Sequence, residues 1–374
     1  MKIAVCNDIR QFNDNQLYGR EWSARFPGSA WVTSLFERQN ELQVEVVSGD
    51  IACAYVREGR WRARDIHVVQ ELDALHGQTL CRLGAVPAVL TLFESPLVAY
   101  RSIDRLIRSP ISFANCVGPR SIFERIPAQR HASHWPLIFP SRWQSQQASP
   151  RPWRYRKNAV LIAANKYWNE RKLPQFHSIK SGLRVVRHGL RKHCSATYRS
   201  CKDLQLHDDR LVLLDAMAIL GDLDVYGTGW QLLDNLPPRW AHKLAKYPDI
   251  FRGRCEDKFE TARRYRFTIA YENIAFPGYV TEKLIDGLVS GALPIYLGAP
   301  DIVEHIPPGT FINVRTLGST NAIVEYMQHI TEPQANVMVV AGQDFLQSVL
   351  GQRSTHEGFA DWIVSLLRGA AGAS

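Results

Sequence analysis

Short apolar, strand-like runs alternate with helix-period stretches along most of the chain, and this alternation is the strongest constraint on its fold. The runs form two series, the first at 2–5, 42–47, 66–69 and 88–93, and the second at 159–164, 223–227, 267–271, 293–297 and 310–314. Stretches such as 209–221 and 256–266 lie between them and have the spacing of amphipathic helices. Strands that alternate with helices form parallel sheets covered by helices. The sequence therefore predicts an α/β fold of the doubly wound kind.

The two series of runs are separated by residues 140–158, a polar and basic stretch with three prolines and no periodicity. Such a composition is typical of a linker, and 374 residues suffice for two hydrophobic cores. We expect an N-terminal α/β domain at 1–145, a linker at 146–157 and a C-terminal α/β domain at 158–350. The remaining segment, 351–374, contains a helical pattern that we expect to pack back across the cleft between the domains.

The formal net charge of +9 favours anionic partners, namely nucleotide phosphates, nucleic acid or an anionic membrane surface. Residues 180–202 are especially rich in Arg, Lys and His, which is typical of a solvated basic face but also suits contact with phosphate or anionic lipid. No run has the length of a membrane span, and the seven scattered cysteines resemble reduced thiols. A cytoplasmic location is expected, with peripheral contact at the inner face of the membrane as an option.

The stretch "YENIAFPGYVTEKLIDGLVSGALPIYLG", 271–298, combines a strand, a turn, a helix and a second strand. The first strand brings Glu272 and Asn273 to its carboxyl end, where open α/β sheets bind ligands. The following helix begins near Thr281, and its free N–H groups favour a phosphate. Lys283 is unfavourable at a helix N-terminus unless an anion binds there. The stretch predicts a nucleotide-phosphate site, although Glu282 and Lys283 alone also fit an ordinary surface ion pair.

Residues 271–314 resemble the signature of the α1,3/1,4-fucosyltransferases, glycosyltransferase family 10, in a bacterial-type member. The matching elements are an E-N pair, Y-V-T-E-K, a helix ending in small residues, P-I-Y-x-G, and a proline-rich turn into T-F-I-N. Upstream, "NAVLIAANK" at 158–166, the stretch 210–230 and "TLFESP" at 91–96 resemble further elements of the family. The resemblance thus covers about 90–350, and the motifs of 271–314 carry most of it.

The resemblance implies a GT-B architecture, in which two Rossmann-like domains with parallel sheets face each other across a cleft. The C-terminal domain would hold GDP-fucose and the N-terminal domain the acceptor. It implies diphosphate contacts for Arg210 and Lys283, a ribose contact for Glu282, and a wider set of donor-binding residues comprising Gly227, Gly229, Glu272, Asn273, Tyr279 and Thr281. The long basic region at 180–202 departs from the family pattern. The heptad-repeat tail and the membrane anchor of some members are also missing, which leaves the acceptor and the mode of attachment open.

The implied reaction is inverting transfer of L-fucose from GDP-β-L-fucose to a hydroxyl of an acceptor glycan, with an α1,3/1,4-type linkage. No cofactor or metal is expected, because cationic side chains can neutralise the leaving diphosphate. "DLD" at 222–224 has the form of a manganese motif of another transferase class, but it opens an apolar strand, so we expect a turn and strand-edge role. A zinc site at His188, His193, Cys194 and Cys201 is not favoured, because the C-x6-C spacing is too loose.

Glu94 is the predicted catalytic base that accepts the proton of the acceptor hydroxyl. It follows the strand at 88–93 and so lies at the rim of the N-terminal sheet, while Ser95 and Pro96 stop the strand. Burial against Phe93 and the opposite domain is expected to raise its pKa. A carboxylate that caps the Ser95–Pro96 turn is the structural alternative, and Glu71 is the alternative base.

Two other functions compete with this prediction. A transferase on the same scaffold would use another GDP-sugar, such as GDP-arabinose, and the fold alone does not separate the two donors. A basic nucleic-acid-binding protein would fit the net charge, but the sequence lacks the aromatic stacking platforms and motifs of that class, so no nucleic-acid partner is expected.

Overall fold

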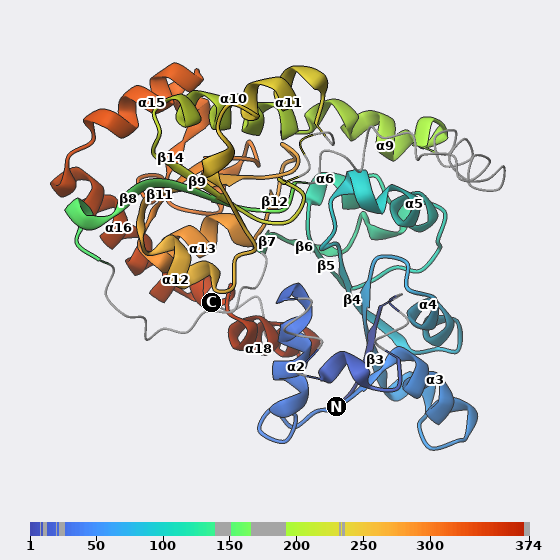
Figure 1. The fold of residues 1–374 in the computed structure, drawn as a ribbon. Helices are drawn as coiled ribbons and strands as arrows, with labels where there is room; N and C mark the ends of the chain where they lie inside the picture. The colour runs from blue at the N-terminus through green and yellow to red at the C-terminus, as the bar shows by residue number, and fades with distance from the viewer. Residues whose placement is uncertain are drawn as a thin grey trace.

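The computed structural model describes residues 1–7, 9, 13–19, 21, 27–138, 151–165, 192–231, 233 and 236–369. Two six-stranded parallel sheets dominate it (Figure 1). The first has the strand order β2-β1-β3-β4-β5-β6 and comprises β1 (Lys2–Cys6), β2 (Glu45–Ser48), β3 (Ile66–Glu71), β4 (Val86–Thr91), β5 (Asn115–Val117) and β6 (Ser133–Trp135).

The second sheet has the order β10-β9-β8-β11-β13-β14, and all its pairs are parallel. Its strands are β8 (Lys157–Ile162), β9 (Leu223–Tyr226), β10 (Phe251–Gly253), β11 (Tyr265–Tyr271), β13 (Leu293–Leu297) and β14 (Ile312–Asn313). Every residue of β13 is buried, as expected of a strand covered by helices on both faces. The predicted doubly wound α/β fold is confirmed, and the two series of apolar runs form two separate sheets. The exact domain boundaries stay predictions, because 139–150 lie outside the described residues.

Helices cover both sheets. Those of the N-terminal half are α2 (Ala30–Glu37), α3 (Gly49–Arg57), α4 (Leu75–Arg82), α5 (Pro96–Leu106) and α6 (Arg120–Phe123). Those of the C-terminal half are α9 (Ala196–Cys201), α10 (His207–Ile219), α11 (Pro238–Leu244), α12 (Lys258–Ala262), α13 (Glu282–Ser290), α14 (Val314–Leu317), α15 (Thr320–His329), α16 (Glu332–Gln347), α17 (Val349–Gln352) and α18 (His356–Leu367). Within the described residues, no helix combines the length and the apolar character needed to cross a bilayer.

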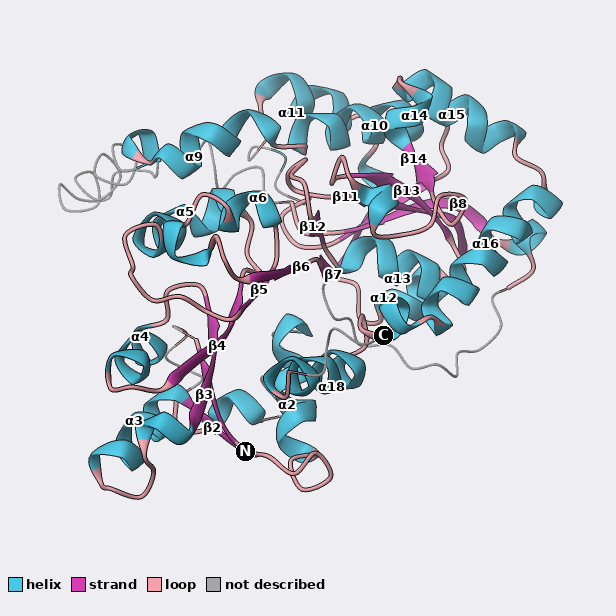
Figure 2. Cartoon of the chain, turned by 180° about the vertical axis from the view of Figure 1, so that it is seen from behind, coloured by secondary structure: helices cyan, strands magenta, loops and turns pink. Residues whose placement is uncertain are grey.

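The last helix, α18, crosses back to the N-terminal half and lies beside α2 (Figures 1 and 2). Its Phe359 packs edge-on against Trp31 at 5.3 Å between ring centroids and lies 5.8 Å from Phe93, while its Trp362 contacts Trp135. These aromatic side chains belong to one hydrophobic cluster with strands of the first sheet. The C-terminal helix therefore completes the N-terminal core.

The segment that joins β11 to α13 also reaches into the N-terminal half. A short strand within it, β12 (Tyr279–Val280), pairs in parallel with β7 (Leu137–Ile138). Ile274, Phe276 and Tyr279 are buried in the same hydrophobic cluster as Leu97 and other residues of the N-terminal half. The turn that precedes α13 is therefore shared by both halves of the molecule.

Candidate functional site

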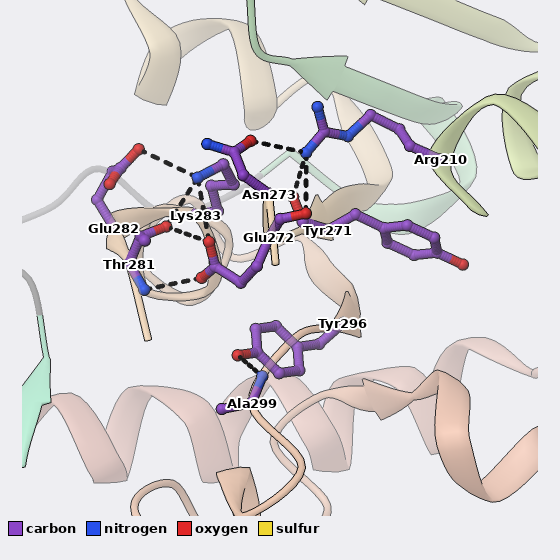
Figure 3. Close-up of polar contacts among 9 residues, drawn as sticks. All are labelled: Arg210, Tyr271, Glu272, Asn273, Thr281, Glu282, Lys283, Tyr296 and Ala299. Atoms are coloured by element: carbon purple, nitrogen blue, oxygen red, sulfur yellow. Dashed lines mark hydrogen bonds and ion pairs between the residues drawn. The ribbon is translucent and has the colours of Figure 1, made fainter. Parts of the chain in front are cut away.

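A buried carboxylate lies at the carboxyl end of β11. Glu272 is fully buried, and its backbone N–H extends the ladder by donating to the Leu297 carbonyl at 2.8 Å. Its carboxylate accepts hydrogen bonds from the Thr281 N–H and Oγ1, both at 2.7 Å, and from Lys283 Nζ at 3.2 Å (Figure 3). A buried charge is tolerated only with such partners. The hydrogen bonds of the Glu272 carboxylate are therefore made to the protein itself. This does not favour the direct contact with the donor sugar nucleotide that the resemblance implies for Glu272.

The space for this carboxylate comes from Gly298. A Cβ at that position would lie 2.5 Å from Glu272 Cγ and 2.3 Å from the Tyr296 hydroxyl, so any larger residue would displace one of them. The Tyr296 hydroxyl accepts a hydrogen bond from the Ala299 N–H at 3.0 Å. Burial, together with the charge of Glu272, raises the pKa of Tyr296 well above its usual value. Neither Gly298 nor Tyr296 was predicted as a site residue, although both lie in the quoted P-I-Y-x-G element.

The N-terminus of α13 has no side-chain cap. Thr281 is the N-cap residue, but its hydroxyl is directed to Glu272 instead of the first turn of the helix. Lys283 Nζ donates to Thr281 Oγ1 at 2.8 Å and lies 3.7 Å from a Glu282 carboxylate oxygen. Burial disfavours the ammonium, but Glu272 and Glu282 outweigh it, so the pKa of Lys283 lies above its usual value. The mouth of the helix thus combines an N-terminus that its N-cap side chain does not cap with an ammonium, an arrangement that suits a bound anion.

A second cation, Arg210 of α10, lies beside the same strand end. Its Nη2 donates to the carbonyls of Tyr271 and Glu272 at 2.8 and 3.1 Å and to Asn273 Oδ1 at 3.3 Å (Figure 3). Its Nε is buried without a hydrogen-bond partner. Burial lowers the pKa of Arg210 to about 10, against the opposing effect of Glu272, so it is charged at neutral pH. A buried guanidinium with an unused donor is unusual and fits an anion beside it.

Tyr279 marks where the two halves meet. It is buried, and burial, followed by the carboxylates of Glu272, Glu94 and Glu282, raises its pKa well above the usual value. Glu94, from the N-terminal half, therefore lies within electrostatic reach of the segment that leads into α13. Asn273 accepts from Arg210 through its side-chain oxygen, and its backbone carbonyl accepts from the Leu206 N–H at 3.1 Å. The structure thus gathers most of the predicted donor residues around one strand end.

The prediction that Glu94 is buried is wrong: its side chain is exposed, and Phe93 instead turns inward under α18. The turn-capping alternative is also not observed, because Ser95 caps α5 by accepting from the Leu97 N–H at 3.3 Å. Glu71 accepts a hydrogen bond from Asn7 Nδ2 at 2.7 Å. Glu94 thus keeps an exposed carboxylate at the rim of the N-terminal sheet, while its role as base stays a prediction.

Gly227 and Gly229 form the turn after β9, with φ of 137° and 87°. A Cβ on Gly227 would lie 2.2 Å from the Ala163 carbonyl oxygen. Glycine is therefore needed here because the backbone at Ala163 passes close to it. Asn165 ties the turn to the end of β8 by donating its side-chain amide to the Gly229 carbonyl at 3.2 Å. The expected approach of a ligand to these two glycines stays a prediction.

Asp222 and Asp224 lie at the opposite, amino-terminal edge of the second sheet. Asp224 is buried and accepts from Lys157 Nζ at 2.7 Å and from Arg252 Nε and the Tyr265 hydroxyl, both at 2.5 Å. These partners confirm the predicted strand-edge role. A cavity of about 400 Å³ opens at this edge, away from Glu272.

The residues considered for zinc do not come together in the described part of the chain, where no group of three His, Cys, Asp or Glu side chains could hold a metal. Cys194 is exposed, whereas Cys201 is buried in the N-terminal cluster. His188 lies outside the described residues, as does the rest of 180–191. The membrane contact expected of the basic segment 180–202 therefore stays a prediction. The described end of that segment forms α9, where Thr197 Oγ1 donates to Asp104 of α5 at 2.7 Å.

Comparisons with known proteins point to one family. Residues 191–338 match the model of the glycosyltransferase family 10 (fucosyltransferase) C-terminal domain. The chain is 35% identical over 91 residues to a putative fucosyltransferase-like protein of Arabidopsis thaliana, which is 24% of this chain and 18% of that protein. It is 33% identical over 75 residues to the alpha-(1,3)-fucosyltransferase FucT of Helicobacter pylori, covering 20% and 16%. The matches thus span less than a fifth of the length of these relatives.

Solved structures share the fold at low identity. An alpha1,3-fucosyltransferase structure has a TM-score of 0.51 at 15% identity, with 99% of this chain and 90% of that chain covered. An Anabaena protein in complex with UDP-glucose has a TM-score of 0.56 at 11% identity, with 99% and 100% covered. Two parallel-sheet halves and these neighbours establish the predicted GT-B architecture. Residues 191–338 are thus similar to the C-terminal domain of glycosyltransferase family 10, the fucosyltransferases, and short stretches of the chain are similar to the two relatives named above.

Proposed function

We propose that the chain transfers L-fucose from GDP-β-L-fucose to a hydroxyl of an acceptor glycan, with inversion at the anomeric carbon and an α1,3/1,4-type linkage. The observation that carries the proposal is the pair of cations at one strand end. Arg210 keeps an unused N–H donor, and Lys283 lies at the uncapped N-terminus of α13. Both lie in the part of the chain that matches the fucosyltransferase family model. A family relative of Helicobacter pylori is named an alpha-(1,3)-fucosyltransferase, which supports the choice of sugar.

The cations act on the leaving group. As the bond between the anomeric carbon and the phosphate oxygen breaks, negative charge grows on the diphosphate of GDP. In this proposal Arg210, Lys283 and the N-terminus of α13 stabilise that charge, and the contacts that hold the two cations beside the strand end before the reaction begins support the role. This arrangement is the reason that we propose a reaction without a required metal.

The acceptor hydroxyl forms the new bond. Its oxygen attacks the anomeric carbon from the face opposite the leaving diphosphate, so a β-linked donor gives an α-linked product. The hydroxyl proton passes to Glu94, and GDP departs with the electron pair of the broken bond. The exposed carboxylate of Glu94 within electrostatic reach of Tyr279 supports this role, because a base must be accessible to the acceptor.

The test is a transfer assay with competing donors. The purified chain is incubated with a glycan array and either GDP-fucose, GDP-arabinose or UDP-glucose, and the products are weighed by mass spectrometry. We expect a mass gain of one deoxyhexose with GDP-fucose, and NMR of the product should give an α linkage. Preferred use of GDP-arabinose would move the donor assignment to that sugar. Absence of transfer from every donor, together with no saturable binding of GDP, would overturn the proposal.

A further inference from the structure

The carboxylate of Glu272 contacts no surface that a ligand can reach, yet it lies directly beneath the proposed anion site. It is fully buried, and three hydrogen bonds converge on its two oxygens. Two of those bonds come from Thr281 and the third from Lys283. These are the N-cap residue of α13 and the ammonium at its mouth, so each bond controls part of the proposed phosphate site.

Thr281 links the carboxylate to the ammonium. Its hydroxyl donates to Glu272 Oε2 at 2.7 Å and accepts from Lys283 Nζ at 2.8 Å, while Lys283 also reaches Glu272 directly at 3.2 Å (Figure 3). The hydroxyl is thereby diverted from capping α13, whose N-cap side chain makes no capping hydrogen bond. One buried carboxylate thus both holds the ammonium and takes the hydroxyl that would otherwise cap the helix.

We propose that Glu272 is a positioning residue, which acts through Thr281 to hold the Lys283 ammonium at the mouth of α13 in the pose that receives the donor diphosphate. This inference rests on the proposed function for the identity of the anion. A glutamine at 272 keeps the size of the side chain but presents an NH₂ group where one oxygen accepted. The new NH₂ group would then face another hydrogen-bond donor, and we expect Lys283 to move away from its present position.

The test is a double-mutant cycle on GDP affinity, measured by calorimetry on the full chain. We expect Glu272→Gln to weaken GDP binding about tenfold or more in the parent, but by less than about threefold in the Lys283→Ala background, because its effect passes through Lys283. Equal effects in the two backgrounds, or parent affinity in Glu272→Gln, would overturn the proposal. Thr281→Val removes the linking hydroxyl, while Glu272 keeps its carboxylate and its hydrogen bonds from the Thr281 N–H and Lys283. Its loss of GDP affinity should likewise be smaller in the Lys283→Ala background, and this variant replaces Glu272→Gln in the test if Glu272→Gln does not fold.

Two controls separate this role from general stability and from the proposed function. Asp224→Asn alters a comparably buried carboxylate at the other edge of the sheet, and it should leave GDP affinity within about twofold of the parent. If the parent itself binds no GDP, the proposed function fails, and a ligand-free crystal structure of Glu272→Gln decides the positioning role alone. The inference requires Lys283 Nζ to have left Thr281 Oγ1 in that structure, and an unmoved ammonium would refute it.

Discussion

Glu272 and Asp224 are buried carboxylates in one sheet, each bonded to a lysine, yet they lie at opposite edges and differ in the state of their cations. Lys157 and Arg252 reach Asp224 from side chains that are 58% and 44% exposed. Lys283, by contrast, is only 15% exposed beside Glu272, and the neighbouring Arg210 is buried with an unused donor. At the amino edge the cations are exposed enough to be hydrated by solvent. At the carboxyl edge they are buried, and Arg210 has a donor that could still bind an anion.

A buried ion pair is therefore not by itself a sign of function. The Asp224 cluster consists of groups that satisfy one another, and it joins four strands, β8, β9, β10 and β11. The Glu272 cluster has the same chemical types, but its donors are not all used, and an uncapped helix points at it. The unused donor and the uncapped helix, and not the ion pair, distinguish the edge at which we propose that the ligand binds.

The largest expected effect is on the chemical step. Glu94→Gln keeps the shape of the side chain but removes its basicity, and it should lower kcat by roughly 10²–10⁴ while GDP affinity is retained. Steady-state kinetics and calorimetry measure the two quantities separately. Glu71→Gln is the matched control at the end of the adjacent strand. If Glu94→Gln transfers sugar at the parent rate and Glu71→Gln does not, the base is Glu71.

The next effect is on donor binding. Lys283→Ala should weaken GDP binding by about 1.5–3 kcal/mol, or roughly 10- to 150-fold, because a charge-assisted contact is lost. Lys157→Ala is the matched control, since it removes the lysine that pairs with Asp224. Calorimetry on both variants tests the comparison directly. Equal losses of affinity would show that the two edges do not differ as described.

A smaller effect, confined to stability, is expected for Asp224→Asn. Burial opposes the ionised form of Asp224, but hydrogen bonds from Lys157, Tyr265 and Arg252 outweigh it and hold its pKa below the usual value. A lowered pKa in the folded state contributes stability that is present above about pH 4 and lost as the pH falls through the folded pKa.

Urea unfolding at several pH values measures this contribution. Asp224→Asn should lose about 1–3 kcal/mol at neutral pH, because hydrogen bonds to a charged acceptor are lost, and it should show a weaker loss of stability in acid, because an amide does not titrate there. GDP affinity should stay at the parent value. A large loss of GDP affinity in this variant would contradict the assignment of the amino edge to folding alone.

The smallest expected effect is that of a chelator. If Arg210 and Lys283 neutralise the leaving diphosphate, turnover should survive EDTA essentially unchanged. The transfer assay with and without EDTA is the measurement, with manganese added back in a third arm. Complete loss with EDTA and recovery with manganese would assign that part of the chemistry to a metal.

Much of the carboxyl edge could be predicted from sequence because its parts are contiguous. Residues 271–298 contain the strand end, the turn and the helix start, and strand–helix alternation fixed the sheet to which they belong. The exposure of Glu94 could not be predicted, since it depends on Phe93 packing beneath α18, more than 250 residues away. The partners of Asp224 come from three distant strands, and periodicity does not reveal which side chains will meet.

The positioning role proposed for Glu272 could also not be predicted from the sequence. The motif places it beside Asn273 at the strand end, and their order alone does not distinguish which of the two a ligand can reach. Burial of one and not the other depends on the turn folding back, so that Thr281 meets the carboxylate, and on Gly298 leaving room beneath it. These are three-dimensional contacts between residues with no local pattern in common.

The packing of α18 on the N-terminal half has a consequence for how the chain folds during synthesis. Trp31, Phe93 and the strands beneath them are made well before Phe359 and Trp362, the residues that cover them, which follow more than 260 residues later. A ribosome that adds about 5–20 residues per second leaves this apolar surface open for many seconds. The N-terminal core is thus completed only after the C-terminal sheet has been made, and during that interval a chaperone has an apolar face to hold.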